Sequence, residues 1–169
     1  MKPLRRTKQD WPSALMALML LAALAPAPAR AGGGASCNLS ATPLTFGKYV
    51  PFSSSPSDFT ATITLTCTAP GTVPVPIHGF ITLTGPGGPS GRWLANGAHR
   101  LRYQLYLDPA RTVLWGEGSG GSGTASISGV VGLTTPFRQA LTVYGRILAR
   151  QSDARVGNYA DQITAVLNY

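Results

Sequence analysis

The ten residues 59–68, FTATITLTCT, decide the fold class of this chain. Threonine occupies every second position, and the residues between the threonines are Ala61, Ile63, Leu65 and Cys67. Successive side chains of a β-strand point to opposite faces, so this alternation is typical of a strand that is buried on one face only. Threonine suits the exposed face because it is a good strand former. The stretch therefore predicts a half-buried strand whose Cys67 faces a hydrophobic core.

Further strand patterns recur along the chain, separated by turns rich in glycine and proline. The candidates are residues 39–49, 75–84, 101–107, 112–115, 125–133, 140–149 and 159–169. The clearest turn segments are GPGGPSG at 85–91 and GEGSGGSG at 116–123. Seven or eight short strands, with turn signals roughly every ten residues, predict an all-β fold, an immunoglobulin-like antiparallel β-sandwich.

The composition agrees with one small β-rich domain. The chain has 169 residues, of which 44% are hydrophobic and 12% charged, with 20 glycines and 14 prolines. A disordered polar chain would carry more charge and fewer apolar residues. A helical bundle would contain fewer helix-breaking residues, and the length suits a single domain of ordinary size.

Residues 1–31 have the pattern of a secretory signal peptide. Four basic residues lie within the first eight, the apolar run ALMALMLLAAL follows at 14–24, and Ala29-Arg30-Ala31 is a small-x-small cleavage sequence. A membrane-spanning helix is the alternative, but it needs about 20 apolar residues, and prolines 26 and 28 end this run earlier. We therefore predict export to the periplasm and then the cell surface, a mature domain over residues 32–169, and no stable membrane insertion after cleavage.

Removal of residues 1–31 also changes the charge of the protein. The whole chain has 14 basic and 6 acidic residues, and five of the basic and one of the acidic residues lie in the predicted signal, so the mature domain keeps a net charge of +4. Its basic residues are scattered without a lysine or arginine run. A nucleic-acid surface needs a clustered basic patch, so we expect no nucleic-acid partner.

Cys37 and Cys67 are the two cysteines of the chain, and both lie in the predicted mature domain. The compartment outside the inner membrane is oxidising, so an isolated pair of cysteines favours a disulfide. A reactive thiol or a metal site is the alternative, but neither cysteine has histidine or acidic residues near it in the sequence. We predict a structural disulfide.

Short motifs in a fixed order from Cys37 to Tyr169 resemble the spore coat protein U domain family. They are SATPLTFGKY at 40–49, ITLTC at 63–67, Arg92 with Leu94, LRYQLY at 101–106, WGEG at 115–118, VYGRI at 143–147 and GNYAD at 157–161. The resemblance implies a secreted, non-catalytic β-sandwich of the kind found in spore coat protein U and in subunits of archaic chaperone–usher pili. It implies as partners a periplasmic chaperone, an outer-membrane usher and neighbouring pilus subunits.

The same resemblance implies a sandwich that lacks its final strand. Pilus subunits of this group accept a strand, first from the chaperone and then from the N-terminal extension of a neighbouring subunit. In such strand addition, backbone groups pair along the open edge while alternate apolar side chains fill a groove. Ile163, Ala165, Leu167 and Tyr169 share one face of the last predicted strand. We expect that face to border the groove and to bind the partner strand.

One departure from the pilus pattern precedes Cys37. Polymerising subunits carry a donor segment of alternating apolar residues there, whereas GGGAS at 32–36 has no large apolar side chain. We therefore predict a tip or terminal subunit that accepts a strand and donates none. The alternatives are a spore or cell-surface coat protein, and a tip adhesin that binds a surface or glycan. Trp93 and Trp115 are the candidate adhesive residues, although tryptophan also packs in sandwich cores.

The sequence contains only weak signals for a catalytic, cofactor-binding or metal site. His78 and His99 are isolated, and the carboxylates of the mature domain are spread singly along it. GEGSGG at 116–121 satisfies G-x-G-x-x-G, but a strand-like segment follows it where a nucleotide site needs a helix. We expect a loop there, and no enzymatic activity, cofactor or metal site.

Overall fold

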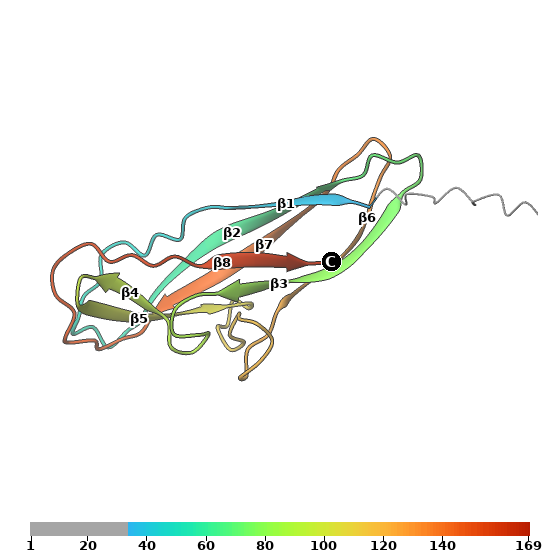
Figure 1. Cartoon of the computed structure of the whole chain (residues 1–169). Helices are drawn as coiled ribbons and strands as arrows, with labels where there is room; N and C mark the ends of the chain where they lie inside the picture. The colour runs from blue at the N-terminus through green and yellow to red at the C-terminus, as the bar shows by residue number, and fades with distance from the viewer. Residues whose placement is uncertain (1–33) are drawn as a thin grey trace, which may run out of the picture. The chain divides into compact units, whose positions relative to one another are not determined.

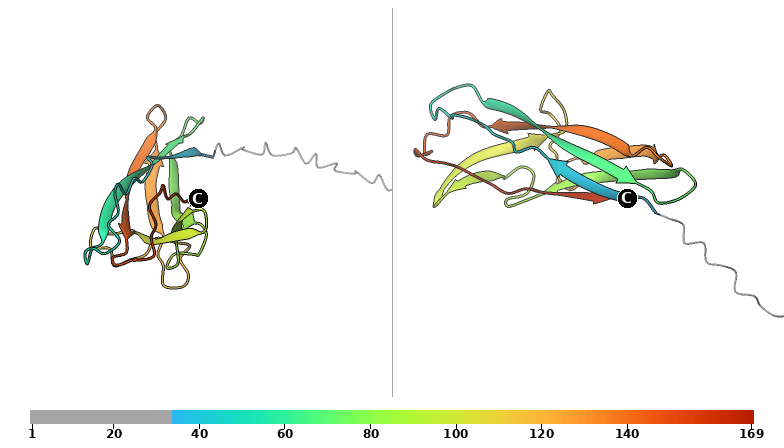
Figure 2. Two further views of the ribbon diagram at one scale, coloured as in Figure 1. Left: turned by 90° about the vertical axis from the view of Figure 1, so that its left-hand side faces the viewer. Right: turned by 90° about the horizontal axis from the view of Figure 1, so that it is seen from above.

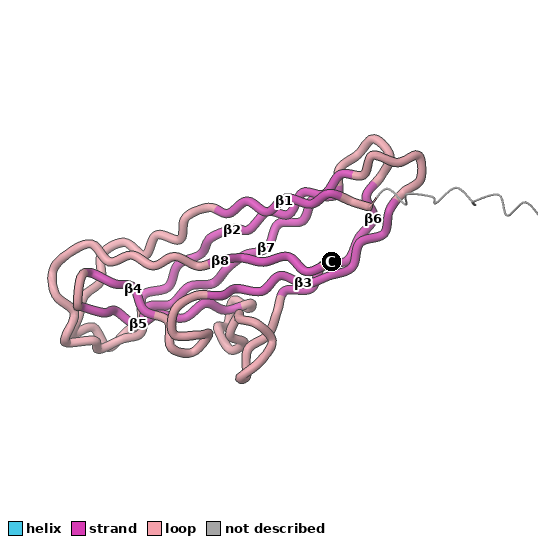
Figure 3. The backbone as a smooth tube through the Cα atoms, viewed as in Figure 1, coloured by secondary structure: helices cyan, strands magenta, loops and turns pink. Residues whose placement is uncertain are grey.

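The computed structural model describes residues 34–169, which fold into eight β-strands (Figures 1 and 3). The predicted signal peptide, residues 1–31, lies outside the described residues. Across residues 34–169 there is no helix long and apolar enough to cross a bilayer. The strands are β1 Ser36–Ala41, β2 Ser57–Thr68, β3 Val75–Thr84, β4 Trp93–Asn96, β5 His99–Tyr106, β6 Ala125–Val131, β7 Phe137–Ile147 and β8 Thr164–Asn168.

The strands form two antiparallel sheets that face each other (Figure 2). One sheet has five strands in the order β1-β2-β7-β5-β4, and the other has three in the order β6-β3-β8. The prediction of an antiparallel all-β sandwich is confirmed. Strands far apart in sequence pair closely, as β2 does with β7 from Ser57↔Ile147 to Cys67↔Phe137.

The core lies between the sheets and follows the period-two pattern of the sequence. In β2 the residues between the threonines are buried, with Ile63 4% exposed and Leu65 and Cys67 fully covered. β7 buries alternate residues in the same way from Val143 to Ile147, and β5 does so from Leu101 to Leu105. β3 instead buries residues 81–83 in succession. The hydrophobic face predicted for residues 59–68 is therefore confirmed.

The predicted disulfide is present and joins two neighbouring strands. Cys37 of β1 lies opposite Cys67 of β2, and their Sγ atoms are 2.07 Å apart. β1 is an outer strand that pairs with β2 alone. The disulfide therefore fixes β1 to the sheet at a position where hydrogen bonds exist on one side only.

The first predicted strand differs from the observed one. β1 covers Ser36–Ala41 rather than residues 39–49, and the last backbone bond to β2 is donated by Thr42 N to the carbonyl of Thr62 at 2.9 Å. Pro43 follows and has no N–H for the ladder, so the strand ends there. Residues 42–46 cross over β7 instead, where Gly145 leaves room for Leu44: a Cβ at this glycine would lie 2.6 Å from Leu44 Cδ2.

Two other predictions of strands differ in detail. The short β4 was not predicted, because Trp93–Asn96 has four residues and shows little alternation. Residues 112–115 do not form a strand and contribute isolated bridges instead, Tyr106↔Leu114 and Trp115↔Gly123. The predicted strand at residues 75–84 coincides with β3, and the remaining predicted strands are present with shifted ends.

Candidate functional site

A groove separates the edges of the two sheets, between β1 and β8. Among residues 34–169, β1 pairs only with β2 and β8 pairs only with β3. Each of these two strands therefore has one edge that no other described strand covers. In Figure 1 both strands run along the same side of the sandwich.

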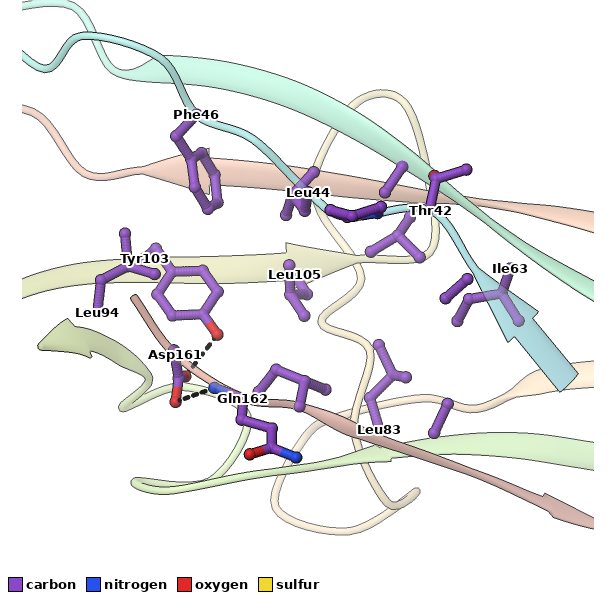
Figure 4. Close-up of a pocket in the computed structure, with 16 residues that line it drawn as sticks. Thr42, Leu44, Phe46, Ile63, Leu83, Leu94, Tyr103, Leu105, Asp161 and Gln162 are labelled. Atoms are coloured by element: carbon purple, nitrogen blue, oxygen red, sulfur yellow. Dashed lines mark hydrogen bonds between the residues drawn. The ribbon is translucent and has the colours of Figure 1, made fainter. Parts of the chain in front are cut away.

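A cavity of about 370 Å³ opens between these edges (Figure 4). Residues 41–44 and Phe46 line one side of it, and Asp161, Gln162, Ile163 and Ala165 line the other. Buried apolar residues of β2, β3, β4, β5 and β7 form its floor, including Ile63, Leu83 and Leu105. The lining is thus mainly apolar and gives direct access to the core. We call this feature the β1–β8 groove.

The four residues predicted to bind a partner strand occupy different places along this groove. Ile163 and Ala165 line the cavity, and Leu167 packs against the core farther along β8. All three are half-buried, whereas Thr164, Val166 and Asn168, which alternate with them, are exposed. Tyr169 is 61% exposed, and its hydroxyl lies 3.4 Å from the carbonyl oxygen of Ala35. The shared face is therefore present from Ile163 to Leu167, while most of the Tyr169 side chain is exposed.

A partly buried polar pair lies at one end of the cavity. The hydroxyl of Tyr103 donates a hydrogen bond of 2.7 Å to Oδ2 of Asp161, and Oδ1 of Asp161 accepts the N–H of Gln162 at 2.8 Å (Figure 4). Tyr103 is 2% exposed. Burial is the main cause that raises the pKa of Tyr103 above its ordinary value, and the hydrogen bond to Asp161 raises it further. Tyr103 is therefore a neutral donor that fixes the start of the segment leading into β8.

Sequence reasoning missed the side of the groove formed by residues 41–46. It treated residues 39–49 as one strand, which would place their alternate side chains in the sheet rather than across its open edge. The prediction took Pro43 as an edge-type interruption within this strand, whereas the paired strand ends before it, because proline has no N–H for the ladder. Asp161 was noted as part of a family motif, but its contact with Tyr103 joins residues 58 positions apart, and sequence spacing cannot reveal such a pair.

The two tryptophans proposed as adhesive residues lie in different environments. Trp115 is 1% exposed, and its Nε1 donates to the carbonyl of Ile81 at 2.9 Å. Its assignment to an exposed adhesive surface is therefore wrong, because the ring is part of the core. Trp93 is half-buried on the outer face of β4, and the guanidinium carbon of Arg100 lies 4.2 Å from the centre of its ring.

Other candidate chemistry of the described region is limited. His78 Nδ1 lies 3.2 Å from Ser128 Oγ on the exposed face of the three-stranded sheet. Within residues 34–169, no three histidine, cysteine or acidic side chains gather closely enough to hold a metal ion. The G-x-G-x-x-G match at 116–121 is followed by β6 rather than a helix, so the loop prediction is confirmed.

Comparison with models of protein families finds that the Spore Coat Protein U domain matches residues 24–166. The match covers most of the chain and confirms the resemblance carried by the motifs from Cys37 onward. A comparison with curated proteins finds no match.

Proposed function

Because the chain belongs to the Spore Coat Protein U domain family, we propose that it is a structural subunit of a surface appendage, completed by a β-strand from another chain. Proteins of this family are structural surface proteins associated with spore coats and pilus-like appendages, and are not known as enzymes. In the proposal, a periplasmic chaperone occupies the β1–β8 groove first and a neighbouring subunit occupies it later, at an outer-membrane usher.

The half-buried face of β8 carries the proposal. Ile163, Ala165 and Leu167 pack on the core, and Ile163 and Ala165 also line the cavity. An added strand in the groove would pair with the uncovered backbone edges and insert alternate side chains into the cavity. Each large apolar side chain that becomes fully buried in this way contributes about 1.5–3 kcal/mol. This gain favours a donor segment with apolar residues at every second position.

The segment before Cys37 supports a terminal position for this subunit. With cleavage after Ala31, the residues GGGAS would precede the first cysteine. Glycine, alanine and serine side chains bury too little apolar surface to fill pockets in the groove of a neighbour. The proposal is therefore a subunit that accepts a strand and donates none.

Co-expression of the full chain with a candidate chaperone, with variants on the two faces of β8, tests the proposal. Ala165→Asp places a carboxylate in the cavity, and we expect the stoichiometric complex seen with the wild type to be lost. Val166→Asp is the matched control, because Val166 is the next residue of β8 and is 40% exposed on the opposite face. It should leave the complex intact.

Two results would count against strand acceptance. One is equal capture of both variants by the chaperone. The other is a wild-type protein that is monomeric and fully stable without any partner strand. A thiol assay for the Cys37–Cys67 disulfide and a circular dichroism spectrum establish that the Ala165→Asp protein has folded.

A coat protein is the second candidate within the same family. The test that separates the two candidates is the state of the exported protein. A pilus-type subunit should be recovered from the periplasm bound to a chaperone, whereas a free-standing coat component should be recovered without one.

A further inference from the structure

A further cavity lies among the loops that precede β2 and β8. In Figure 1 these loops lie at the end of the sandwich away from the start of β1. The volume of this cavity is about 230 Å³. Lys48, Tyr49 and Pro51 line one side, residues 154–157 and Tyr159 line the other, and Leu101 lies between them. None of these residues lines the cavity of the groove. We call it the tip cavity.

The two tyrosines of the tip cavity are held in place through their hydroxyl groups. Tyr49 donates to the carbonyl of Leu148 and accepts the N–H of Gln151, each at 3.0 Å. Tyr159 donates to the carbonyl of Arg155 at 3.0 Å and accepts the N–H of the same residue at 2.9 Å. Because both hydroxyls already have backbone partners, what these side chains offer a ligand is the surface of two fixed aromatic rings.

The tip cavity is also cationic. Lys48 and Arg155 line it from opposite sides, and the ion pairs found in residues 34–169 all involve Asp58, so neither cation is neutralised by one. Lys48 and Arg155 are the charged residues that line the tip cavity, and both are cationic, which favours an anionic ligand.

Two exposed apolar side chains lie on the loops around the tip cavity, and the turn that carries one of them, Phe52, is closed by a backbone hydrogen bond. Val156 is completely exposed, and Phe52 is 80% exposed at a turn closed by the bond from Ser53 N to the carbonyl of Val50 at 3.1 Å. Arg150 N donates to the carbonyl of Ser53 at 3.1 Å and joins this turn to the opposite loop. Val156 lines the tip cavity and Phe52 follows its lining residue Pro51, so both offer apolar surface next to the cationic side chains.

We propose that the tip cavity binds an acidic sugar unit of a polysaccharide, of the uronic acid class. The sugar carboxylate would bind Lys48 and Arg155, while the apolar face of the sugar ring would pack on the tyrosine rings and Val156. A concave site of this size suits one ring of a polymer rather than a flat bilayer. The tip cavity shares no lining residue with the β1–β8 groove, and a further cavity of about 390 Å³ adjoins both, sharing Tyr159 with the tip cavity and Phe46 with the groove.

Titration of the exported protein, purified together with any chaperone bound to it, with oligogalacturonate tests this proposal, with maltooligosaccharide as the neutral comparison and phosphatidylglycerol vesicles as the lipid comparison. We expect oligogalacturonate to bind, with an affinity that falls as salt rises, and the neutral oligomer not to bind. Lys48→Gln and Arg155→Gln should each weaken binding by about tenfold, as expected for loss of one charge-assisted hydrogen bond.

Arg138→Gln is the matched control, since Arg138 is an exposed arginine on β7, opposite Thr66 at the far end of the strand from Arg146. It changes the net charge by the same amount and should leave the affinity unchanged. Absence of oligogalacturonate binding overturns the proposal. An equal loss of affinity in Arg138→Gln also overturns it, because the attraction would then be unspecific. Binding to the vesicles in place of the acidic sugar overturns it as well, and would assign the loops to a membrane surface.

Discussion

At the scale of single residues, a buried arginine connects the two sheets. Arg92 is 1% exposed and donates from Nη2 to the carbonyl of Leu83 at 2.9 Å and from Nη1 to the carbonyl of Trp115 at 3.0 Å. Burial lowers the pKa of Arg92 from its ordinary value, so the cation depends on these carbonyls. It precedes β4 of one sheet and binds Leu83 in β3 of the other. Arg92 belongs to a family motif in the sequence, but the sequence alone does not show that backbone carbonyls are its partners.

Replacement of this arginine by methionine should destabilise the protein strongly. Arg92→Met keeps a long side chain but leaves buried carbonyl groups unpaired, so we expect a loss of about 2–4 kcal/mol in the free energy of unfolding. Urea denaturation measures it. Arg102→Met, at an exposed arginine on β5, should change the value by less than about 0.5 kcal/mol. A similar small effect at both positions would mean that Arg92 contributes no more than a surface residue.

An exposed ion pair at the start of β2 should make stability depend on pH. Arg146 donates to both carboxylate oxygens of Asp58, at 2.6 and 2.7 Å, and this hydrogen bonding, against some desolvation, holds the pKa of Asp58 below 3.8. A lowered carboxyl pKa stabilises the fold above pH 3.8, and the effect is lost as the pH falls through the lowered value. Asp58→Asn should therefore cost under about 1 kcal/mol at neutral pH. The free energies of unfolding of the wild type and Asp58→Asn, measured by urea denaturation, should converge in acid. A difference that persists there would contradict this account.

At the scale of elements, the alternating strands were predictable and the edges of the sheets were not. β2 could be predicted because five threonines alternate with buried residues, a pattern that one strand carries by itself. The path of residues 42–46 depends on Gly145, which is about 100 positions away in sequence, and the pairing of β8 with β3 joins Phe80 to Asn168. Such long-range contacts decide which face closes the core, and no local pattern reports them.

The close approach of β8 to β3 depends on Gly79. A Cβ at this position would lie 2.2 Å from the carbonyl oxygen of Asn168 and 3.0 Å from Tyr169 Cβ. Gly79→Ala should therefore displace the end of β8, and the amide hydrogens of residues 164–168 should exchange at least about tenfold faster. Gly71→Ala is the control, because a Cβ there meets Val73 backbone atoms no closer than 3.8 Å. Unchanged exchange in Gly79→Ala would show that β8 tolerates the displacement without opening.

At the scale of the whole molecule, the disulfide determines whether one side of the groove persists. β1 has one neighbouring strand and its inward residues are only half-buried, so hydrogen bonds on one side and the Cys37–Cys67 bond hold it in place. The bond closes a loop with a sequence separation of 30, which stabilises a fold by roughly 3–4 kcal/mol in the chain-entropy model. The double variant Cys37→Ala with Cys67→Ala should lose about this amount in urea denaturation. It should also lose capture by a chaperone, because detachment of β1 removes one of the two edges that an added strand would pair with. A variant that unfolds at lower urea but still binds the chaperone as tightly as the wild type would show that β8 alone accepts the strand.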